Sequence, residues 1–426
     1  MKKRIVSLLA CGTIAAGAVC GVAGCDSGTK LTVWASAAQQ ETLAQMVEEF
    51  KAANPDINYD IRIGIGEEDM AYSNVSKDAS AAADVYCYSN DQLVPLLRVG
   101  ALARLGGEKL AAVKANNSAE SVKAGSINYG KETEMVYGYP YASDNGYFMF
   151  YDKSVLSETD VTSLDTIIEK CEAAGKKIAW ALDVPWYTAG WFFTFGCTYN
   201  VEYDYNQNYK ESVVELNGFD GEAGIKASKA MAQLADSSAF AGKGTDNNTI
   251  TTGFSTGTTA VAVTGTWLAK SIQQSLGDNY GVCELPSVTV DGETVHLASF
   301  TGYKLIGVNA HSSNLPEAHA LAAFLSGESM QKVRFEKHLI GPTNTVVANL
   351  DAVKNDPTIK ALNAQTAHAV EQTSVPSNFW EPLKSYGLNI MDKLVDETGS
   401  GEGANKKLTY QQRLTQMVNL MKSSLT

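Results

Sequence analysis

Residues 183–199 read DVPWYTAGWFFTFGCTY, and seven of these seventeen residues are aromatic, whereas the aromatic fraction of the whole chain is 9%. An aromatic ring offers a broad apolar face, and Trp and Tyr add one polar group, so such rings suit ligand stacking as well as core packing. At about 100° per residue, a helix over 186–197 places most of these rings on one stripe, which is typical of a core-facing surface. Trp186 falls outside that stripe. It follows Pro185, a residue favoured at a helix start, so we expect its ring near a ligand.

Five more residues have types and positions suited to binding. Tyr88 and Asp91 come at the end of the predicted strand ADVYCYS, and ligands of α/β proteins collect at the carboxyl ends of strands. Asp144 follows the predicted strand YGYPYAS, Trp267 ends AVAVTGTW, and Trp380 lies in PSNFWEPL. Each has a plain structural alternative: the tryptophans as core residues, Asp144 as a turn residue and Asp91 as a helix N-cap.

The elements that must position these residues follow an α/β order. LTVWAS, INYDIRIGI and ADVYCYS read as strands, and residues 39–53 form an amphipathic helix with apolar side chains at the spacing i, i+3, i+4, i+7. The pattern then predicts a strand pair in GYPYASDNGYFMFYDKSVL, broken by an Asp-Asn-Gly turn. Further helices are predicted at 162–174, 186–197, 221–236, 266–276, 315–326, 328–338, 356–372 and 379–395, and strands near 259–264, 280–284 and 295–308. This order predicts the α/β fold class.

The charge balance excludes one class of partner. The 426-residue chain has a net charge of −13 and is long enough for two or three domains. An acidic surface disfavours nucleic acid, which needs Lys and Arg to release counterions. We therefore expect no nucleic-acid partner.

The N-terminus reads as an export signal rather than as part of the fold. MKKR is followed by an apolar stretch rich in small residues, which predicts a signal peptide over residues 1–24. Val22-Ala23-Gly24-Cys25 resembles the bacterial lipobox, which implies cleavage before Cys25 and lipidation of its thiol, with 25–29 as a tether. Two acyl chains would suffice for stable membrane anchoring. The alternative is a plain signal peptide with a chance cysteine.

Metal and cofactor chemistry find no sequence support. Four cysteines remain beyond Cys25, at 87, 171, 197 and 283, widely spaced and without a C-x-x-C motif. We expect buried thiols, with a Cys171–Cys197 disulfide left open. The five histidines form no H-E-x-x-H or similar motif, so the sequence predicts neither a metal site nor a cofactor.

A succession of segments resembles one known family over nearly the whole chain from Lys30 onward. The segments are LTVWAS, EEFKAANPDINY, ADVYCYSNDQL, YGYPYASDNGYFMFYDKSVL, FSTGTTAVAVTGTW and SFTGYKLIGVNAHSSNLPEAHALAAFLSGESMQKVRFEKHLIGPTN. Their order and spacing resemble the extracellular solute-binding proteins of ABC importers, in the maltose/maltodextrin-binding branch.

The resemblance implies a two-lobed periplasmic-binding-protein-like fold of type II, with a ligand cleft between the lobes and hinge crossings. One lobe would comprise 30–142 plus 300–350, and the other 146–296 plus 353–426. The ligand residues that the resemblance implies here are Asp144, Trp186, Tyr187, Trp267 and Trp380, with Gln39 and Gln40 near the family's polar sugar contacts. Tyr88 and Asp91 join them from their position at a strand end, and Tyr303 lies close to a crossing strand, with packing as its alternative role. The family carries a charged pair near Gln39 and Gln40 and a basic residue at Gln92, so contacts on that side differ here.

The function implied is capture of maltodextrin-type oligosaccharide outside the cell, by a lipid-anchored monomer that delivers it to an ABC-transporter permease. Sugars suit the candidate residues, because pyranose C–H faces stack on aromatic rings and hydroxyls donate to carboxylates. The alternatives are another oligosaccharide or a polyol as cargo, or a surface glycan-binding protein without a permease.

An enzyme is the remaining class to consider. The segment from Gly253 to Gly257 fits the G-x-S-x-G nucleophile elbow around Ser255, but a polar stretch precedes it where that motif needs an apolar strand. A glycosidase would need two carboxylates about 5 to 9.5 Å apart, and Asp91, Asp144 and Asp183 could supply such a pair. Nothing in the resemblance supports hydrolysis, so we expect no enzyme activity.

Overall fold

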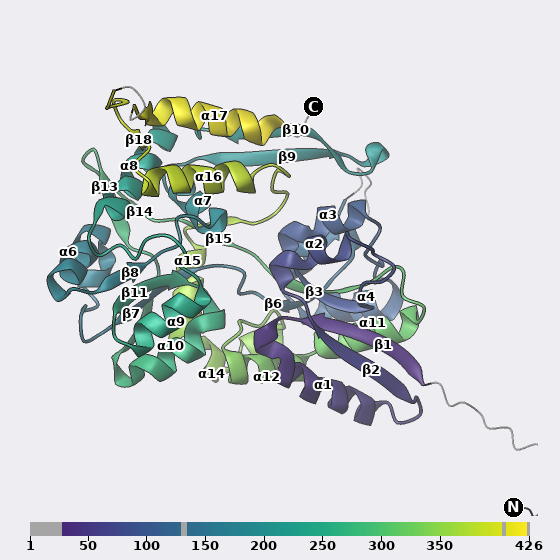
Figure 1. Ribbon diagram of the computed structural model, residues 1–426. Helices are drawn as coiled ribbons and strands as arrows, with labels where there is room; N and C mark the ends of the chain where they lie inside the picture. Colours follow the sequence, from purple (N-terminus) through teal and green to yellow (C-terminus); the bar gives the residue numbers. More distant parts are fainter. Residues whose placement is uncertain (1–27, 129–133, 403–405, 424–426) are drawn as a thin grey trace, which may run out of the picture.

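Two central sheets organise the molecule, which we describe from a computed structural model covering residues 28–128, 134–402 and 406–423 (Figure 1). The expected signal peptide and the lipidation residue Cys25 lie outside these residues. No helix within the described ranges is long and apolar enough to span a membrane.

The first sheet has the order β2-β1-β3-β16-β6. Its strands are β1 (Thr29–Ala35), β2 (Tyr59–Ile65), β3 (Val85–Ser89), β6 (Tyr139–Ala142) and β16 (Lys304–Val308). β1 pairs in parallel with β2 and β3, whereas β16 is antiparallel to β3 and β6. A strand from residue 304 onward therefore completes a sheet begun at residue 29, which makes this lobe discontinuous in sequence.

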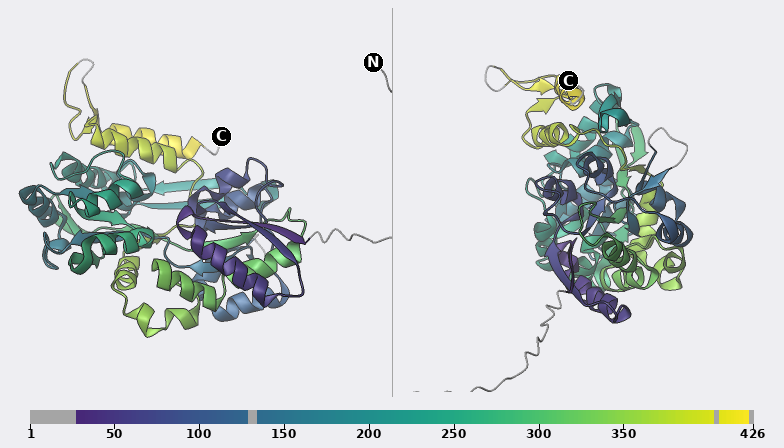
Figure 2. Two further views of the ribbon diagram at one scale, coloured as in Figure 1. Left: turned by 60° about the horizontal axis from the view of Figure 1, so that its bottom comes forward. Right: turned by 90° about the vertical axis from the view of Figure 1, so that its right-hand side faces the viewer.

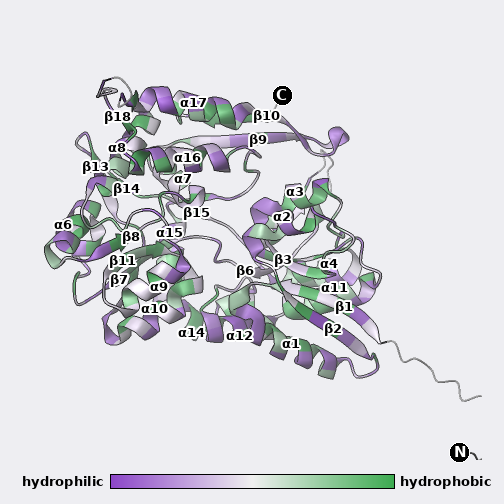
Figure 3. Ribbon diagram, in the orientation of Figure 1, coloured by the Kyte–Doolittle hydropathy of each residue, from purple (hydrophilic) through white to green (hydrophobic). Residues whose placement is uncertain are grey.

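The second sheet has the order β12-β7-β11-β8. Its strands are β7 (Phe148–Asp152), β8 (Lys177–Ala179), β11 (Thr259–Thr264) and β12 (Tyr280–Cys283). β7 and β11 are almost wholly buried, and Figure 3 shows them as largely hydrophobic, as expected for strands covered by helices on their faces.

Helices surround both sheets in the two lobes (Figure 2). The longer ones are α1 (Gln40–Ala53), α4 (Gly107–Asn116), α6 (Leu164–Ala174), α7 (Pro185–Thr194), α8 (Glu222–Asp236), α9 (Asn247–Ser255), α10 (Ala269–Leu276), α11 (Leu315–Leu325), α12 (Glu328–His338), α15 (Pro357–Thr366), α16 (Trp380–Met391) and α17 (Tyr410–Lys422). The shorter ones are α2 (Ala71–Val75), α3 (Leu93–Arg98), α5 (Ala119–Ala124), α13 (Thr345–Ala348) and α14 (Asp351–Lys354). Helix α1 buries Leu43, Met46, Val47 and Phe50, so the predicted amphipathic face is confirmed.

Four clusters of buried side chains make up the core of the described residues, and the smallest joins Tyr86 and Tyr88 of β3 to Tyr209. One cluster of buried side chains belongs to the first sheet and its helices, and a larger one to the second lobe. A third cluster joins Phe148 and Phe150 of β7 to Phe335 of α12 and Val347 of α13. Phe335, Leu339 and Val347 thus pack with β7 of the second sheet, although they lie in the stretch expected to belong to the first lobe, whose cluster holds Ile340.

Two sequence predictions about local structure are wrong. The strands in GYPYASDNGYFMFYDKSVL exist as β6 and β7, but they lie in different sheets, because residues 143–147 cross between the lobes. The helix predicted at 356–372 ends at Thr366, and β17 (Ala369–Glu371) pairs in parallel with β15 (Ser299–Thr301). Backbone pairing with β15 at the junction overrides the helical pattern there.

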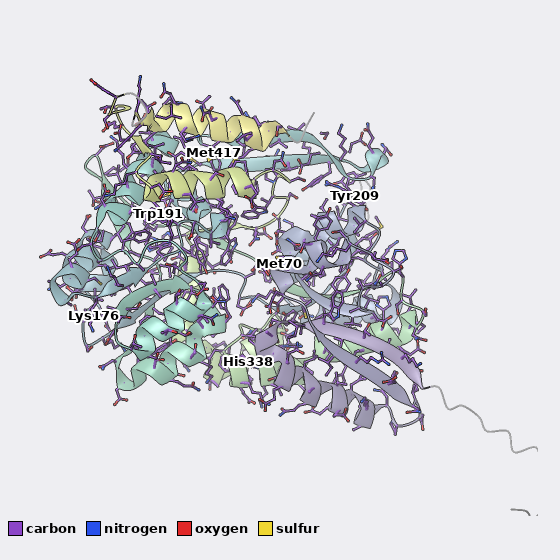
Figure 4. All side chains as sticks on the ribbon, viewed as in Figure 1. Met70, Lys176, Trp191, Tyr209, His338 and Met417 are labelled. Atoms are coloured by element: carbon purple, nitrogen blue, oxygen red, sulfur yellow. The ribbon has the colours of Figure 1, made fainter. Side chains whose placement is uncertain are left out.

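A long hairpin is the main element that the sequence analysis missed. β9 (Thr198–Asp204) and β10 (Lys210–Asn217) are antiparallel and extend from the second lobe over α3 of the first (Figure 1). At the tip, labelled by Tyr209 in Figure 4, the Arg98 guanidinium donates to the Tyr209 carbonyl at 2.8 Å. Asn208 Nδ2 donates to the Arg98 carbonyl at 3.0 Å. Figure 3 shows β9 as largely hydrophilic, which explains why no apolar pattern revealed it.

The remaining strands form small pairs. They are β4 (Ser126–Ile127) with β5 (Met135–Val136), β13 (Ser287–Val290) with β14 (Glu293–His296), and β18 (Val395–Asp396) with β19 (Leu408–Thr409).

Candidate ligand-binding site

Four aromatic rings from three separate segments meet where residues 143–147 cross between the lobes. We call Tyr147, Trp186, Tyr187 and Trp267 the aromatic cluster. The Trp186 ring centroid lies 4.8 Å from that of Tyr147, 5.2 Å from that of Tyr187 and 5.9 Å from that of Trp267. Trp186, Tyr187 and Trp267 are half-buried, so part of their surface stays open. Three of the four were predicted from the sequence, and the structure brings them together.

Local sequence features set these rings in place. Pro185 begins α7, which puts Trp186 and Tyr187 in its first turn, while Trp191 and Phe192 further along are buried as the stripe predicted. Trp267 follows β11 after Gly265. A Cβ at Gly265 would come within 2.0 Å of the Trp267 ring, so only glycine allows the ring to lie there.

Gln372 links the aromatic cluster to the first lobe. Trp186 Nε1 donates to Gln372 Oε1 at 2.7 Å, and Asn145 Nδ2 donates to the same oxygen at 3.1 Å. The Gln372 carbonyl accepts from Asn90 Nδ2 at 2.7 Å. Asn90 also bonds the backbone of Tyr303. One buried glutamine therefore connects a ring of the second lobe with the end of β3 in the first.

Asp91 lies beside this link, and the pKa of its carboxyl is raised. Burial raises the pKa of its carboxyl to about 7, against the lowering effect of hydrogen bonds from Gln92 and Gln372. Gln92 Nε2 donates to Asp91 Oδ2 at 3.0 Å, while Oδ1 has no hydrogen-bond partner among the described residues. The side chain is half-buried, but Oδ1 itself is a buried acceptor without a partner, which would accept from a ligand hydroxyl that reaches it.

Asp144 is fully buried, and it bonds Thr266 and Lys304, which both lie next to Trp267. Its Oδ1 forms an ion pair with Lys304 Nζ at 3.2 Å, and the Thr266 hydroxyl donates to its Oδ2. Lys304 Nζ lies 5.3 Å from the Trp267 ring centroid, within cation–π range. Burial lowers the pKa of Lys304, but the carboxylates of Asp144 and Glu68 together raise it above its usual value. In this conformation the Asp144 carboxylate positions Trp267 and reaches no open surface.

Gln39 belongs to a second group, which we call the buried polar cluster: Gln39, Glu68, Tyr141 and Arg334. Tyr141 donates its hydroxyl to Glu68 Oε1 at 2.8 Å, and Arg334 Nε donates to Gln39 Oε1 at 3.1 Å. The Arg334 guanidinium lies 4.8 Å from the Tyr141 ring centroid. Gln39 Nε2 completes the set by facing Glu68 at 3.4 Å. Because its amide is used on both sides inside the fold, Gln39 faces no ligand in this structure.

The other predicted contacts lie apart from the aromatic cluster. Tyr88 is fully buried in the first lobe. The Gln40 amide donates to the carbonyls of Ala35, Ser36 and Gly64, which ties β1 to β2. Tyr303 bonds Asn90 through its backbone. Trp380 is half-buried at the start of α16, with ring centroids of Phe379 and Phe300 at 5.3 and 5.9 Å.

Sequence reasoning missed three polar residues that organise the site. Gln372 gave no signal, because it lies in a stretch predicted as helix. Lys304 lies in SFTGYKL next to Tyr303, and Glu68 lies in GIGEED, where an acidic run followed a predicted strand. Only the packing of distant segments brings Lys304 beside Asp144, Glu68 beside Gln39 and Gln372 beside Trp186.

Ser255 lacks the setting of a nucleophile elbow. It ends α9, and its hydroxyl donates to the Thr252 carbonyl at 3.0 Å. The predicted helix end, glycine turn and strand are confirmed: Gly257 has a φ of +68° and β11 follows. Two surface depressions on the first lobe, lined among others by Ala53 and by Lys109, contain none of the predicted contacts.

The four cysteine thiols among the described residues are free, and three of them are buried. The expectation of buried thiols is confirmed for Cys87, Cys171 and Cys197, whereas Cys283 is half-buried. No disulfide joins Cys171 to Cys197.

Known proteins share this fold. A solved structure with acarbose has 27% sequence identity and a TM-score of 0.78, over 94% of this chain and 100% of that one. The maltotriose-binding protein of Thermus thermophilus, bound with maltotriose, has 16% identity and a TM-score of 0.76, over 93% and 100% of the two chains. The galactooligosaccharide-binding protein of Bacillus subtilis (strain 168) is 23% identical over 376 residues, 84% of each chain.

These similarities confirm the two-lobed α/β fold that the sequence predicted. The family described as bacterial extracellular solute-binding protein matches residues 45–361, which is well over half of the chain. The protein therefore belongs to the bacterial extracellular solute-binding protein family.

Proposed function

We propose that this protein captures maltodextrin-type oligosaccharide between its lobes and delivers it to an ABC-transporter permease. The observation that carries the proposal is the aromatic cluster beside the unpartnered Asp91 oxygen. Stacking surface next to a carboxylate acceptor matches a pyranose, which has an apolar C–H face and a rim of hydroxyl donors.

The proposed contacts are a subset of those predicted from the sequence. Trp186, Tyr187, Trp267 and Trp380 supply stacking faces, and Asp91 accepts from a hydroxyl. Asp144 holds Trp267 and Lys304 in place, and Tyr303 stays an outlying candidate. We leave out Tyr88 and Gln39, which are buried, and Gln40, whose amide bonds the backbone.

Binding is coupled to the junction of the lobes. A ligand that touches Trp186 in one lobe and Asp91 in the other would favour the form in which both contacts exist. Gln372 already spans this gap through Trp186 and Asn90, so it is placed to hold that form. We propose lobes of 30–142 plus 300–350 and 146–296 plus 353–426, closing by a hinge.

A second cargo is favoured by the Bacillus subtilis relative, whose name is galactooligosaccharide-binding protein. The same stacking faces accept galactosyl rings, and only the hydroxyl partners would differ.

We propose that Cys25 carries the lipid anchor, that the protein acts as a monomer outside the cell, and that it carries out no hydrolysis.

Isothermal titration calorimetry on the chain from Asp26 onward, which holds every described residue, tests the cargo. The panel is maltose, maltotriose, maltoheptaose, acarbose and a β-galactosyl trisaccharide. One-to-one micromolar binding of the maltodextrins supports the proposal, and preference for the galactoside supports the second cargo. No heat with any of them contradicts both.

Two further assays test for hydrolysis and for delivery to a permease. Shorter products after incubation with maltoheptaose would reveal an enzyme. Stimulation of the reconstituted transporter's ATPase by the loaded protein supports delivery to a permease, and its absence favours a glycan-binding protein that works alone.

A further inference from the structure

Three side chains far apart in sequence form a compact group in the second lobe. Glu284 follows β12, His296 ends β14, and His368 lies between α15 and β17. Their ligand-type atoms all lie within 4.8 Å of one another. Glu284 Oε2 is 3.6 Å from His296 Nε2 and 4.0 Å from His368 Nε2, and the two imidazole rings stack with centroids 3.7 Å apart.

The tautomer of His296 prepares it for metal binding. Its Nδ1 lies 3.0 Å from the Leu297 carbonyl oxygen, which can only accept, so Nδ1 carries the proton. Nε2 then carries a lone pair, and it lies 3.6 Å from Glu284 Oε2. That nitrogen is buried and has no hydrogen-bond partner among the described residues. A backbone carbonyl that fixes the other ring nitrogen is the usual support of a metal-ligating histidine.

A single buried glutamine anchors all three ligand segments. Gln365 Oε1 accepts from the backbone of Leu285 at 2.7 Å, and its Nε2 donates to the Leu297 carbonyl at 3.1 Å. The Gln365 carbonyl accepts from His368 N at 2.9 Å. The residues next to Glu284 and His296, and His368 itself, are therefore held to one residue, which gives the group a rigid base.

We propose that Glu284, His296 and His368 bind a Zn²⁺ ion. Two imidazoles and one carboxylate suit Zn²⁺, whereas Ca²⁺ and Mg²⁺ prefer sets of oxygen ligands. Tetrahedral zinc needs ligand atoms about 3.3 Å apart, given metal–nitrogen distances of about 2.0 Å. The two imidazole planes are now nearly parallel, at 17°, so the His368 ring must rotate out of the stack to turn its Nε2 lone pair toward the ion. The side chains of Glu284 and His368 are 42% and 41% exposed, which leaves them room to move. A water would fill the fourth position.

This site is separate from the proposed sugar contacts, and no sequence motif reveals it. The ligands come from positions 284, 296 and 368, without the short spacings that mark zinc motifs. The strand that follows His368, β17, pairs with β15 at the junction of the lobes. An ion here would therefore stabilise the start of β17 and, through it, the pairing of β17 with β15.

The test is a zinc titration against a chromophoric chelator, using the chain from Asp26 onward without a histidine tag and stripped with EDTA. We expect one Zn²⁺ per chain, and no competition from CaCl₂. His368→Ala should weaken zinc binding by at least about ten-fold. The matched control is His311→Ala, which removes an exposed histidine in the first lobe and should leave zinc affinity unchanged.

Two further measurements guard against a folding defect. Glu284→Gln keeps the shape of the side chain and should also weaken zinc binding at least about ten-fold. Zinc should raise the melting temperature of the wild type and of His311→Ala, but not that of His368→Ala, since binding to the folded state alone stabilises it. No zinc binding by the wild type, or wild-type affinity in both His368→Ala and Glu284→Gln, overturns the proposal.

Discussion

The aromatic cluster and the buried polar cluster use their side chains in opposite ways. In the buried polar cluster, Arg334, Gln39 and Glu68 bond one another inside the first lobe. In the aromatic cluster, Trp186 and Trp267 are half-buried, with ring centroids 5.9 Å apart. Gln39 of the buried polar cluster and Trp186 and Trp267 of the aromatic cluster were chosen from the same family resemblance, yet only the two tryptophans keep surface available for a ligand. A match between a residue of this chain and a position of the family therefore locates that residue in the fold. Whether its side chain is free to bind a ligand depends on how far it is buried.

The largest effect should follow from breaking the buried polar cluster. Arg334→Met leaves Gln39 Oε1 and the Leu325 carbonyl without their donor and removes the positive charge near Glu68. We expect the free energy of unfolding to fall by about 3 kcal/mol, with sugar affinity of the folded protein unchanged. Urea unfolding measures the stability, and calorimetric titration with sugar measures the affinity.

The matched control for this change lies on the same helix, α12. Lys332→Met removes an exposed ion pair with Glu336 at 3.8 Å, and exposed pairs contribute roughly 0–1 kcal/mol. Equal stability of the two variants would show that the buried polar cluster does not hold the first lobe together.

An intermediate effect is expected at Gln372, which joins the two lobes. Gln372→Ala removes the acceptor of Trp186 Nε1 and Asn145 Nδ2, so unfolding free energy should fall by roughly 1–3 kcal/mol. Sugar affinity should fall as well, because Trp186 loses its fixed orientation. Gln411→Ala, an exposed glutamine of α17, is the control, and unchanged affinity in Gln372→Ala would separate Gln372 from the site.

A smaller and pH-dependent effect is expected at Asp91. Its folded pKa of about 7 lies above the unfolded value of about 3.9, so the folded state holds the extra proton between these pH values. Ionisation therefore costs stability as pH rises from about 4 to about 7. Relative to wild type, Asp91→Asn should gain stability over this window, on the order of 1 kcal/mol or more at pH 8. Unfolding at pH 4.5, 6 and 8 measures it, and a constant difference would refute the assigned pKa.

The smallest effect is expected at Ser255. Its hydroxyl bonds only the preceding turn of α9 and is exposed, so Ser255→Ala should change stability by less than about 0.5 kcal/mol. Sugar affinity should not change. If the wild type shortened maltoheptaose and Ser255→Ala did not, Ser255 would be a nucleophile, contrary to what its position at a helix end indicates.

Sequence patterns predicted what depends on local periodicity and on family order. The apolar face of α1, the Pro185 start of α7 and the strand β11 were predicted, because each follows from spacing within a few residues. The hairpin β9–β10 was not, because its strands are largely polar. Local pattern also paired β6 with β7, and only the lobe boundaries implied by the family resemblance separated them, since their pairing partners lie far along the chain.

The same division holds for the candidate site. Trp186, Tyr187 and Trp267 could be chosen by residue type and position. The roles of Gln372 and Lys304 depend on contacts with Asn90 and Asp144 across the crossing segments, which no local pattern records. Burial of Tyr88 and Gln39 likewise arises from packing between distant segments, so residue type alone misassigned their surroundings.

The most direct test of the account is a calorimetric titration of maltotriose into the wild type, Trp186→Ala and Trp267→Ala. We predict that each substitution weakens binding by at least about 1.5 kcal/mol, the scale of losing a buried aromatic contact, while circular dichroism shows an intact fold. Wild-type affinity in both variants would contradict the account, because the rings would then serve only the packing of the second lobe.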